Sequence, residues 1–182
     1  IVPTQFTPGK NGEEADFHIE LELVADAGLV GLPNAGKSSL LNAVTNALAK
    51  VGSYQFTTLE PNLGVYYGKV LADVPGLIEG ASTGKGLGIK FLKHIEKVKL
   101  LLHSIDGTSD DVTRDYKIVR NELKNFNLKL LEKEEIILIT KSDLVEEKDL
   151  EKKINALKKF KKEVLPVSIH DFDSLENLKK HL

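Results

Sequence analysis

Residues 31–38 constrain this chain most strongly, because they read Gly-Leu-Pro-Asn-Ala-Gly-Lys-Ser and fit the pattern G-x-x-x-x-G-K-[ST]. The apolar segment 27–30 predicts a buried strand leading into them, and residues 39–44 predict an amphipathic helix leading out. The two glycines let successive backbone N–H groups and the helix N-terminus face a phosphate. A glycine-rich turn without a ligand is the alternative, but the complete pattern with both flanks favours a phosphate-binding loop.

Within this loop, Lys37 would place its ammonium group between the β- and γ-phosphates of a nucleotide, and the Ser38 hydroxyl would ligate Mg²⁺. We therefore predict a nucleoside triphosphate site. The loop residues expected to contact the nucleotide are Gly31, Pro33, Asn34, Ala35, Gly36, Lys37, Ser38 and Ser39.

A second motif follows a short apolar run, residues 136–139, which predicts another buried strand. It reads Thr140-Lys141-Ser142-Asp143 and resembles the guanine-specificity motif of GTPases, usually Asn-Lys-x-Asp. The Asp143 carboxylate can accept hydrogen bonds from guanine N1–H and the 2-amino group, which adenine lacks, and such sites discriminate by about 10⁴-fold. The stem of Lys141 would cover the base plane. The tetrapeptide alone could be a solvated turn, but its place at a strand end about a hundred residues after the phosphate loop favours the base site.

The base site departs from the GTPase pattern at two positions. Thr140 stands where Asn is commoner; its hydroxyl can still brace the loop, so we expect somewhat weaker base binding rather than lost specificity. Residues 164–169 predict a last strand with a degenerate form of the Ser-Ala guanine loop, in which Ile169 follows Ser168. The backbone N–H that would contact guanine O6 survives the exchange of Ala for Ile169.

Residues 71–76 resemble the D-x-x-G element that follows the third strand of GTPases. Asp73 would hold Mg²⁺ through water, and the N–H of Gly76 would sense the γ-phosphate, with Pro75 also against the nucleotide. Alone, these residues would indicate only a strand that ends in a Pro-Gly turn.

Phe56, Thr57 and Thr58 lie in a polar stretch between the first predicted helix and the next strand, and all three are expected beside the nucleotide. A threonine there would close over Mg²⁺ when GTP is present, and the spacing from Lys37 favours Thr58. The expected metal ligands are therefore Ser38, Thr58 and Asp73, and the expected catalytic residues are Lys37, Thr58 and Gly76.

Longer stretches around these elements resemble Obg-type GTPases. Residues 51–64 are similar to their first switch region and residues 73–96 to their glycine-rich second switch. Residues 1–24 are similar to the end of the glycine-rich Obg domain and residues 25–182 to the GTPase domain. The resemblance implies GTP or GDP and Mg²⁺ as ligands, and a ribosomal subunit or ribosomal RNA as a partner. One departure is the short link from residue 64 to residue 73, where a longer hairpin is usual, so the hairpin is either trimmed or incomplete in this sequence.

The order of elements predicts the fold. Residues 17–23 alternate with period two and predict a half-buried strand, residues 100–106 predict a further strand, and residues 112–126 and 148–160 have helical spacing. We therefore predict a P-loop α/β fold, a doubly wound and mostly parallel six-stranded sheet of the Ras-like type with helices on both faces. Every motif follows a predicted strand, as ligand binding at the carboxyl ends of the strands requires.

The composition agrees with one globular domain and a short extension, since 41% of the 182 residues are hydrophobic and 29% are charged. No apolar run approaches the roughly 18 residues of a membrane span and no secretory signal begins the chain, so we expect a cytoplasmic monomer that enters no membrane. The absence of Cys excludes disulfides within this sequence, and the absence of Met predicts a piece of a longer protein. A net charge of −2 argues against general binding of nucleic acid.

The sequence lacks residues that accelerate hydrolysis in fast GTPases. Ras-like enzymes place a glutamine directly after D-x-x-G to orient the attacking water, but Leu77 occupies this position and cannot form a hydrogen bond. Both arginines of the chain, Arg114 and Arg120, fall on a later predicted helix, so we expect no arginine finger in cis, a group worth about 10³ to 10⁵ in rate. We predict slow intrinsic hydrolysis. Asn34 either binds a potassium ion beside the phosphates, as in some GTPases with Asn at this position, or caps a turn.

The sequence therefore predicts a GTP-binding and slowly GTP-hydrolysing molecular switch, for which the family resemblance implies a role in assembly of the large ribosomal subunit. A nucleotide-gated regulatory protein with incidental hydrolysis, in stress or cell-cycle control, is the alternative. An ATP-using P-loop enzyme is a further alternative, which Asp143 disfavours.

The remaining candidates receive structural interpretations. His94 and His103 lack an acidic partner at a telling spacing, so we expect them to be structural. The lysines of residues 158–162 could touch RNA phosphates, but a solvated helix face balanced by nearby glutamates is favoured. Asp110 and Asp111 are expected to cap the helix that follows them.

Overall fold

The computed structural model describes residues 9, 12, 14–16, 25–45, 62–73 and 96–182. The strands are β1 (Ala27–Val30), β2 (Asn62–Tyr66), β3 (Lys69–Asp73), β4 (Leu100–Asp106), β5 (Glu134–Thr140) and β6 (Glu163–Pro166). The α-helices are α1 (Lys37–Thr45), α3 (Val112–Phe126), α4 (Glu147–Lys158) and α5 (Phe172–Lys179), and two short 3₁₀ helices are η2 (Leu128–Glu132) and η3 (Ser142–Leu144). The strand expected over residues 17–23 lies outside the described residues.

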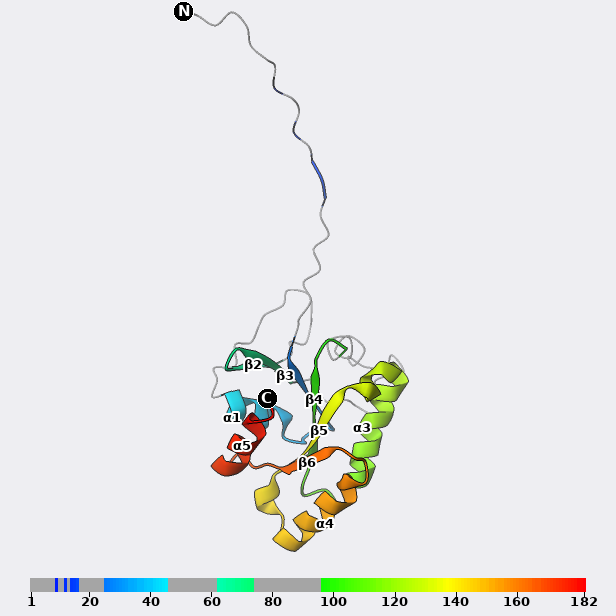
Figure 1. Cartoon of the computed structure of the whole chain (residues 1–182), viewed down its shortest axis with the longest axis vertical. Coiled ribbons are helices and arrows are strands. Elements are labelled where there is room, and N and C mark those ends of the chain that lie inside the picture. Colours follow the sequence, from blue (N-terminus) through cyan, green and yellow to red (C-terminus); the bar gives the residue numbers. More distant parts are fainter. Residues whose placement is uncertain (1–8, 10–11, 13, 17–24, 46–61, 74–95) are drawn as a thin grey trace, which may run out of the picture.

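Within the described part of the chain, six strands form one sheet in the order β2-β3-β1-β4-β5-β6 (Figure 1). The strand β1 lies between β3 and β4 and is parallel to both, and β4, β5 and β6 continue the sheet in parallel. Among the six described strands, only β2 is antiparallel to its neighbour, β3. The predicted doubly wound, mostly parallel six-stranded sheet is confirmed.

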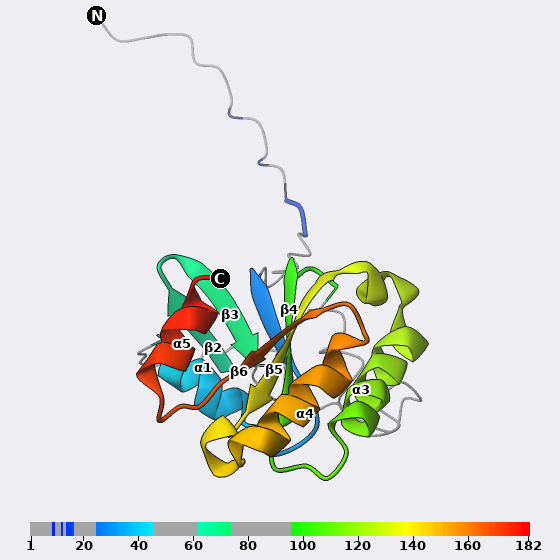
Figure 2. The same ribbon diagram turned by 60° about the horizontal axis from the view of Figure 1, so that its bottom comes forward.

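Helices cover both faces of this sheet, because successive strand residues point to opposite sides. Leu102 and Leu138 pack with α1 and α5 on one face, whereas Leu101 and Ile137 face the other side, where α3 and α4 pack. Figure 2 shows α1 with α5 against one side of the sheet and α3 with α4 against the other. The apolar strand runs that predicted buried strands are therefore buried from both sides.

The helix α3 illustrates how local sequence sets the bounds. Its N-cap is Asp111, whose carboxylate accepts a hydrogen bond of 2.9 Å from the backbone N–H of Arg114, as predicted for the Asp110-Asp111 pair. The helix then runs to Phe126, the predicted limit. The helix α4 begins one residue before and ends two residues before the predicted span of 148–160.

The short link from residue 64 to residue 73 is a closed hairpin. The strands β2 and β3 pair from Asn62–Asp73 to Tyr66–Lys69, and only Tyr67 and Gly68 connect them. Both connecting residues have positive φ, 44° and 80°, as in the two-residue turns that match the twist of paired strands. Of the two sequence interpretations, the structure favours a trimmed hairpin.

None of the helices in the described ranges is long and apolar enough to cross a lipid bilayer.

Candidate functional site

The carboxyl ends of β1, β3, β4 and β5 meet at one edge of the sheet, because these strands are parallel. The loop that leaves β1 is the predicted phosphate loop. A Cβ atom at Gly31 would lie 2.3 Å from the carbonyl oxygen of Ser104, so the loop leaves β1 in contact with β4 and only glycine fits there. Gly36 has a φ of +76° directly before α1 begins at Lys37. The predicted loop therefore has a backbone that requires glycine at both of these positions.

Lys37 lies inside this loop with only 6% of its surface exposed. Its ammonium group donates hydrogen bonds to the carbonyl oxygens of Gly31 at 3.2 Å and Leu32 at 3.0 Å. Burial lowers the pKa of Lys37, and the nearby Asp73 carboxylate opposes that shift. A buried cation with one partial counter-charge is suited to an anionic ligand, since phosphate oxygens would compensate its desolvation.

Ser38 and Asp73 form a candidate magnesium site. The Ser38 hydroxyl donates a hydrogen bond to Oδ2 of Asp73, which ends β3 and is 3% exposed. The other carboxylate oxygen of Asp73, Oδ1, is buried and has no hydrogen-bond partner among the described residues. A buried, unpaired carboxylate oxygen is costly, and Mg²⁺ is usually held by one or two carboxylates together with nucleotide phosphates and water. The two side chains therefore fit the predicted ion.

A pocket of about 250 Å³ lies beside the phosphate loop, at the ends of β5 and β6. Six residues assigned to the nucleotide from the sequence line it: Gly36, Ser39, Thr140, Lys141, Asp143 and Ile169. Sequence reasoning missed its other walls, Leu40, Leu144, Val167 and His170. Leu144 and His170 directly follow the two base motifs, and that adjacency was the available signal. The phosphate loop and both base motifs thus meet in one pocket.

Thr140 joins the base motif to the phosphate loop. Its hydroxyl lies 2.9 Å from the carbonyl oxygen of Ala35 and 3.0 Å from that of Ile105, and the residue is 4% exposed. The expected bracing by a hydroxyl is therefore observed. Its effect on base affinity remains a prediction.

Asp143 lies at the exposed mouth of the pocket, in η3. A hydrogen bond from the Ser168 side chain lowers the pKa of Asp143 below its ordinary value of 3.8. At neutral pH Asp143 is therefore a carboxylate and a hydrogen-bond acceptor. Ser168 is buried and lies beyond the end of β6, which is shorter than predicted. Its backbone N–H donates to the hydroxyl of Ser174 at 3.1 Å, which leaves the next N–H, that of Ile169, as the candidate donor to a base.

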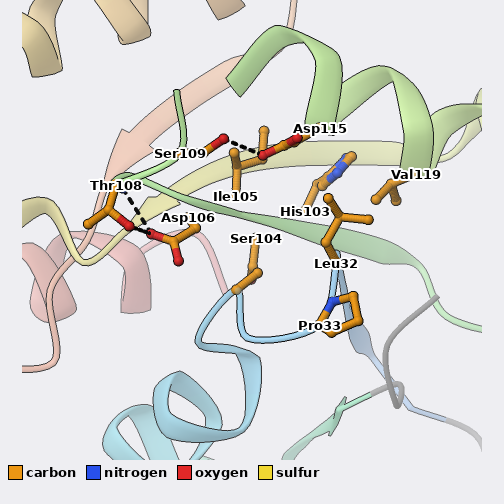
Figure 3. A pocket seen from close by; sticks show the side chains of 11 residues that line it. Leu32, Pro33, His103, Ser104, Ile105, Asp106, Thr108, Ser109, Asp115 and Val119 are labelled. Atoms are coloured by element: carbon orange, nitrogen blue, oxygen red, sulfur yellow. Dashed lines mark hydrogen bonds between the residues drawn. The ribbon is translucent and has the colours of Figure 1, made fainter. Parts of the chain in front are cut away.

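Pro33 and Ala35 line a different cavity, of about 210 Å³, on the side of the phosphate loop that faces β4 and α3. Figure 3 shows Leu32 and Pro33 opposite His103 and Val119 in this cavity. Asn34 lies between the two loop residues, exposed and with a φ of 63°. The structure therefore separates Pro33 and Ala35, by position, from the base pocket.

In the structure His103 has an acidic partner, Glu135. Its Nδ1 lies 3.0 Å from Oε1 of Glu135, and both side chains are fully buried between β4, β5 and α3. Glu135 also accepts hydrogen bonds from Arg120 at 2.9 Å and Tyr116 at 3.3 Å. Sequence spacing concealed the pair because the two residues lie on neighbouring strands. The contacts agree with a structural role for His103, and they hold Arg120 on α3 against Glu135.

Several predicted site residues lie outside the described residues: Phe56, Thr57, Thr58, Pro75 and Gly76, together with Leu77 and His94. Of the three expected metal ligands, the structure therefore brings together Ser38 and Asp73.

Comparisons with known proteins agree with this geometry. Residues 26–141 match the family described as 50S ribosome-binding GTPase. The chain is 50% identical over 99% of its length to the GTPase Obg of Pelagibacter ubique, and 51% identical over 92% of its length to that of Rickettsia felis. It covers 57% and 52% of those two proteins, so it spans about half the length of the curated relatives it matches.

Solved structures show the same fold. Era bound to MgGDPNP and a fragment of 16S ribosomal RNA has a TM-score of 0.65 at 25% identity, with 88% of this chain and 56% of that chain covered. The FeoB G-domain of Methanococcus jannaschii has a TM-score of 0.57 at 24% identity, with 88% and 96% covered. The predicted resemblance to Obg-type GTPases is confirmed, and the chain belongs to the 50S ribosome-binding GTPase family.

Proposed function

We propose that this chain binds GTP and hydrolyses its γ-phosphate slowly, as a molecular switch. One observation carries the proposal: a single sheet edge holds a phosphate loop around the buried Lys37 and, beside it, a pocket that contains Asp143. The relatives that the chain matches at about half identity are named GTPases. GTP and GDP are the ligands that suit both parts of the edge.

In the proposed reaction, water attacks the γ-phosphorus, the bond to the bridging oxygen breaks, and GDP and phosphate leave. Lys37 and the N–H groups of the phosphate loop stabilise the charge that develops on the phosphate oxygens. Ser38 and Thr58, with Asp73 through water, would hold Mg²⁺, whose charge would offset part of the negative charge of the phosphates. Gly76 would sense the γ-phosphate through its N–H. Leu77 after the D-x-x-G element, and the engagement of Arg120 with Glu135, support slow turnover.

Guanine selection tests the base half of the proposal. The Asp143→Asn amide keeps one acceptor oxygen but replaces the other by an NH₂ donor, which would face one of the two guanine donors. We expect the ratio of GTP to ATP affinity, measured by calorimetry, to fall by about 100-fold or more. An unchanged ratio would refute guanine recognition by Asp143.

Potassium is a second candidate ligand, beside Asn34. The Asn34 side chain is exposed in the phosphate loop and makes none of the hydrogen bonds found among the described residues, so the turn-capping bond is not observed. An amide oxygen in that position can coordinate a monovalent cation next to the phosphates. Turnover in potassium should exceed turnover in sodium for the parent chain and be equal in both salts for Asn34→Ala. Equal turnover of the parent chain in potassium and in sodium would refute potassium binding at Asn34.

The partner proposed is a ribosomal subunit or ribosomal RNA. The family description points to the large subunit, and the structurally similar Era, which binds a fragment of 16S ribosomal RNA, supports binding of ribosomal RNA in general. Residues 1–24 are proposed to belong to a preceding domain and residues 25–182 to the GTPase domain. Pelleting of this chain with ribosomal subunits should depend on GTP. Pelleting that is absent with GTP, GDP and no nucleotide alike would favour the alternative, a nucleotide-gated regulator with incidental hydrolysis.

A further inference from the structure

Asp106 lies at the carboxyl end of β4, next to the base motif on the neighbouring strand. It pairs in register with Thr140, the first residue of that motif. Its Oδ2 accepts a hydrogen bond of 2.6 Å from the ammonium group of Lys141. The two side chains are 25% and 36% exposed, so the ion pair is partly screened from water. Asp106 therefore contacts the base motif through Lys141.

The carboxylate of Asp106 is itself held in place. Its Oδ1 accepts hydrogen bonds from the backbone N–H of Thr108 at 2.9 Å and from the Thr108 hydroxyl at 2.7 Å, both visible in Figure 3. Burial acts to raise the pKa of Asp106, but the hydrogen bonds from Lys141 and Thr108 outweigh it and the pKa is lowered. The two carboxylate oxygens thus have different partners, since Oδ1 fixes the side chain and Oδ2 binds Lys141.

Gly107, which directly follows Asp106, is held in place by two other elements. The backbone N–H of Gly107 donates to the carbonyl oxygen of Thr140 at 2.8 Å. The ammonium group of Lys153, on α4, donates to the carbonyl oxygen of Gly107 at 2.6 Å. The position of Asp106 relative to the base motif is therefore set by β5 and α4 as well as by its own strand.

Lys141 is the residue whose side chain Asp106 holds in place. It lines the base pocket from a left-handed backbone conformation, with φ 55° and ψ 36°. A free lysine side chain loses more conformational entropy on ordering than most side chains, so a lysine held before the ligand arrives adds more to affinity. Its ammonium group is directed to Asp106, which leaves its methylene stem along the pocket.

We propose that Asp106 is a positioning residue for base recognition, which holds Lys141 so that the lysine stem lies along the purine plane. The inference rests on the proposed function and names a determinant that the base motif alone does not contain. The stem would touch the purine plane whatever its substituents are. Asp106 therefore supports binding of guanine and hypoxanthine nucleotides equally, and it leaves the γ-phosphate untouched.

The test compares Asp106→Ala and Asp106→Asn with a matched control, Asp110→Asn, which alters an exposed acid in the same loop. Dissociation constants for GDP, GTP and IDP are measured by calorimetry, ADP binding is measured for the parent chain, and turnover is measured separately. We expect both Asp106 variants to bind all three nucleotides about tenfold more weakly, with KM raised and kcat unchanged. The control should match the parent chain.

The asparagine variant separates positioning from structure. An amide that keeps the two Thr108 bonds on its oxygen turns a donor toward the Lys141 ammonium, so binding should fall while thermal stability stays near that of the parent. A merely structural role would move stability and leave binding near the parent value.

A double-mutant cycle with Lys141→Ala decides the route of the effect. If Asp106 acts through Lys141, Asp106→Ala should cause no further loss in the Lys141→Ala background. An equal loss in both backgrounds, or Asp106 variants that bind like the parent, would overturn the proposal. A parent chain that does not prefer GDP to ADP would instead overturn the proposed function, and the two failures are thus distinguishable.

Discussion

Replacing Thr140 by valine tests the link between the two halves of the nucleotide site. The side chain is almost fully buried at the end of β5, with its hydroxyl 2.9 Å from the carbonyl oxygen of Ala35 and 3.0 Å from that of Ile105. One hydroxyl proton can be donated to one acceptor at a time, so the two carbonyl groups share it. Valine has the same shape and replaces the hydroxyl by a methyl group, which removes both contacts and creates no cavity.

The expected cost follows from those contacts. A buried carbonyl group deprived of its donor costs about 1–3 kcal/mol. In a domain of this size, each kcal/mol lowers Tm by about 2–4 °C, so Thr140→Val should unfold about 2–12 °C below the parent chain. Because Ala35 belongs to the phosphate loop, GTP affinity should fall as well, by about tenfold if the loop shifts.

Thermal and urea unfolding, with calorimetry of GTP binding, provide the assay. Thr140→Ser is the matched control, since it keeps the hydroxyl and removes only a methyl group, and it should stay within about 1 kcal/mol of the parent. Should the valine variant unfold and bind GTP like the parent while the serine variant does so too, the hydroxyl contributes nothing and the reasoning is refuted.

Three further predictions concern stability and the loop backbone. Burial acts to raise the pKa of Glu135 in the folded chain, but the hydrogen bond and charge of His103 and the charge of Arg120 outweigh it, and the pKa is lowered. The stability that the Glu135 carboxylate contributes is therefore lost as pH falls below its ordinary pKa of 4.5. The free energy of unfolding, measured with urea, should therefore fall at acid pH in the parent chain and depend less on pH in Glu135→Gln. Asp111→Ala removes the N-cap of α3 and should lower the unfolding free energy by about 1 kcal/mol, measured against Asp110→Ala. Gly31→Ala would drive a methyl group to 2.3 Å from the Ser104 carbonyl oxygen, so nucleotide binding should be lost, and calorimetry that finds parent affinity would contradict this.

The sequence was sufficient for features carried by neighbouring residues. The phosphate loop, the base motif and the alternation of strands and helices are local patterns, and they predicted the sheet, the bounds of α3 and the proximity of Ser38 to Asp73. Asp73 was found because it begins a sequence that resembles the D-x-x-G element, which follows the third strand of GTPases.

Contacts between neighbouring strands could not be read in the same way. Glu135 lies 32 positions from His103 and Lys141 lies 35 positions from Asp106, and no local pattern joins either pair. Each contact depends on the register of β4 with β5, which sets Asp106 beside Thr140. The last strand was predicted too long for a related reason, since the backbone N–H of Ser168 turns to the hydroxyl of Ser174 instead of continuing the sheet.

The described contacts also bear on how a switch could work at this edge. Thr140 ties the base motif to the phosphate loop, Asp106 ties it to the end of β4, and Lys153 holds that end to α4. In the proposed complex, all of these contacts would lie beside the base and the proximal phosphates, which GTP and GDP share. Changes at Thr140 or Asp106 should therefore weaken both nucleotides by the same factor, and the preference for one over the other should depend on groups that reach the γ-phosphate, for which Thr58 and Gly76 are the sequence candidates.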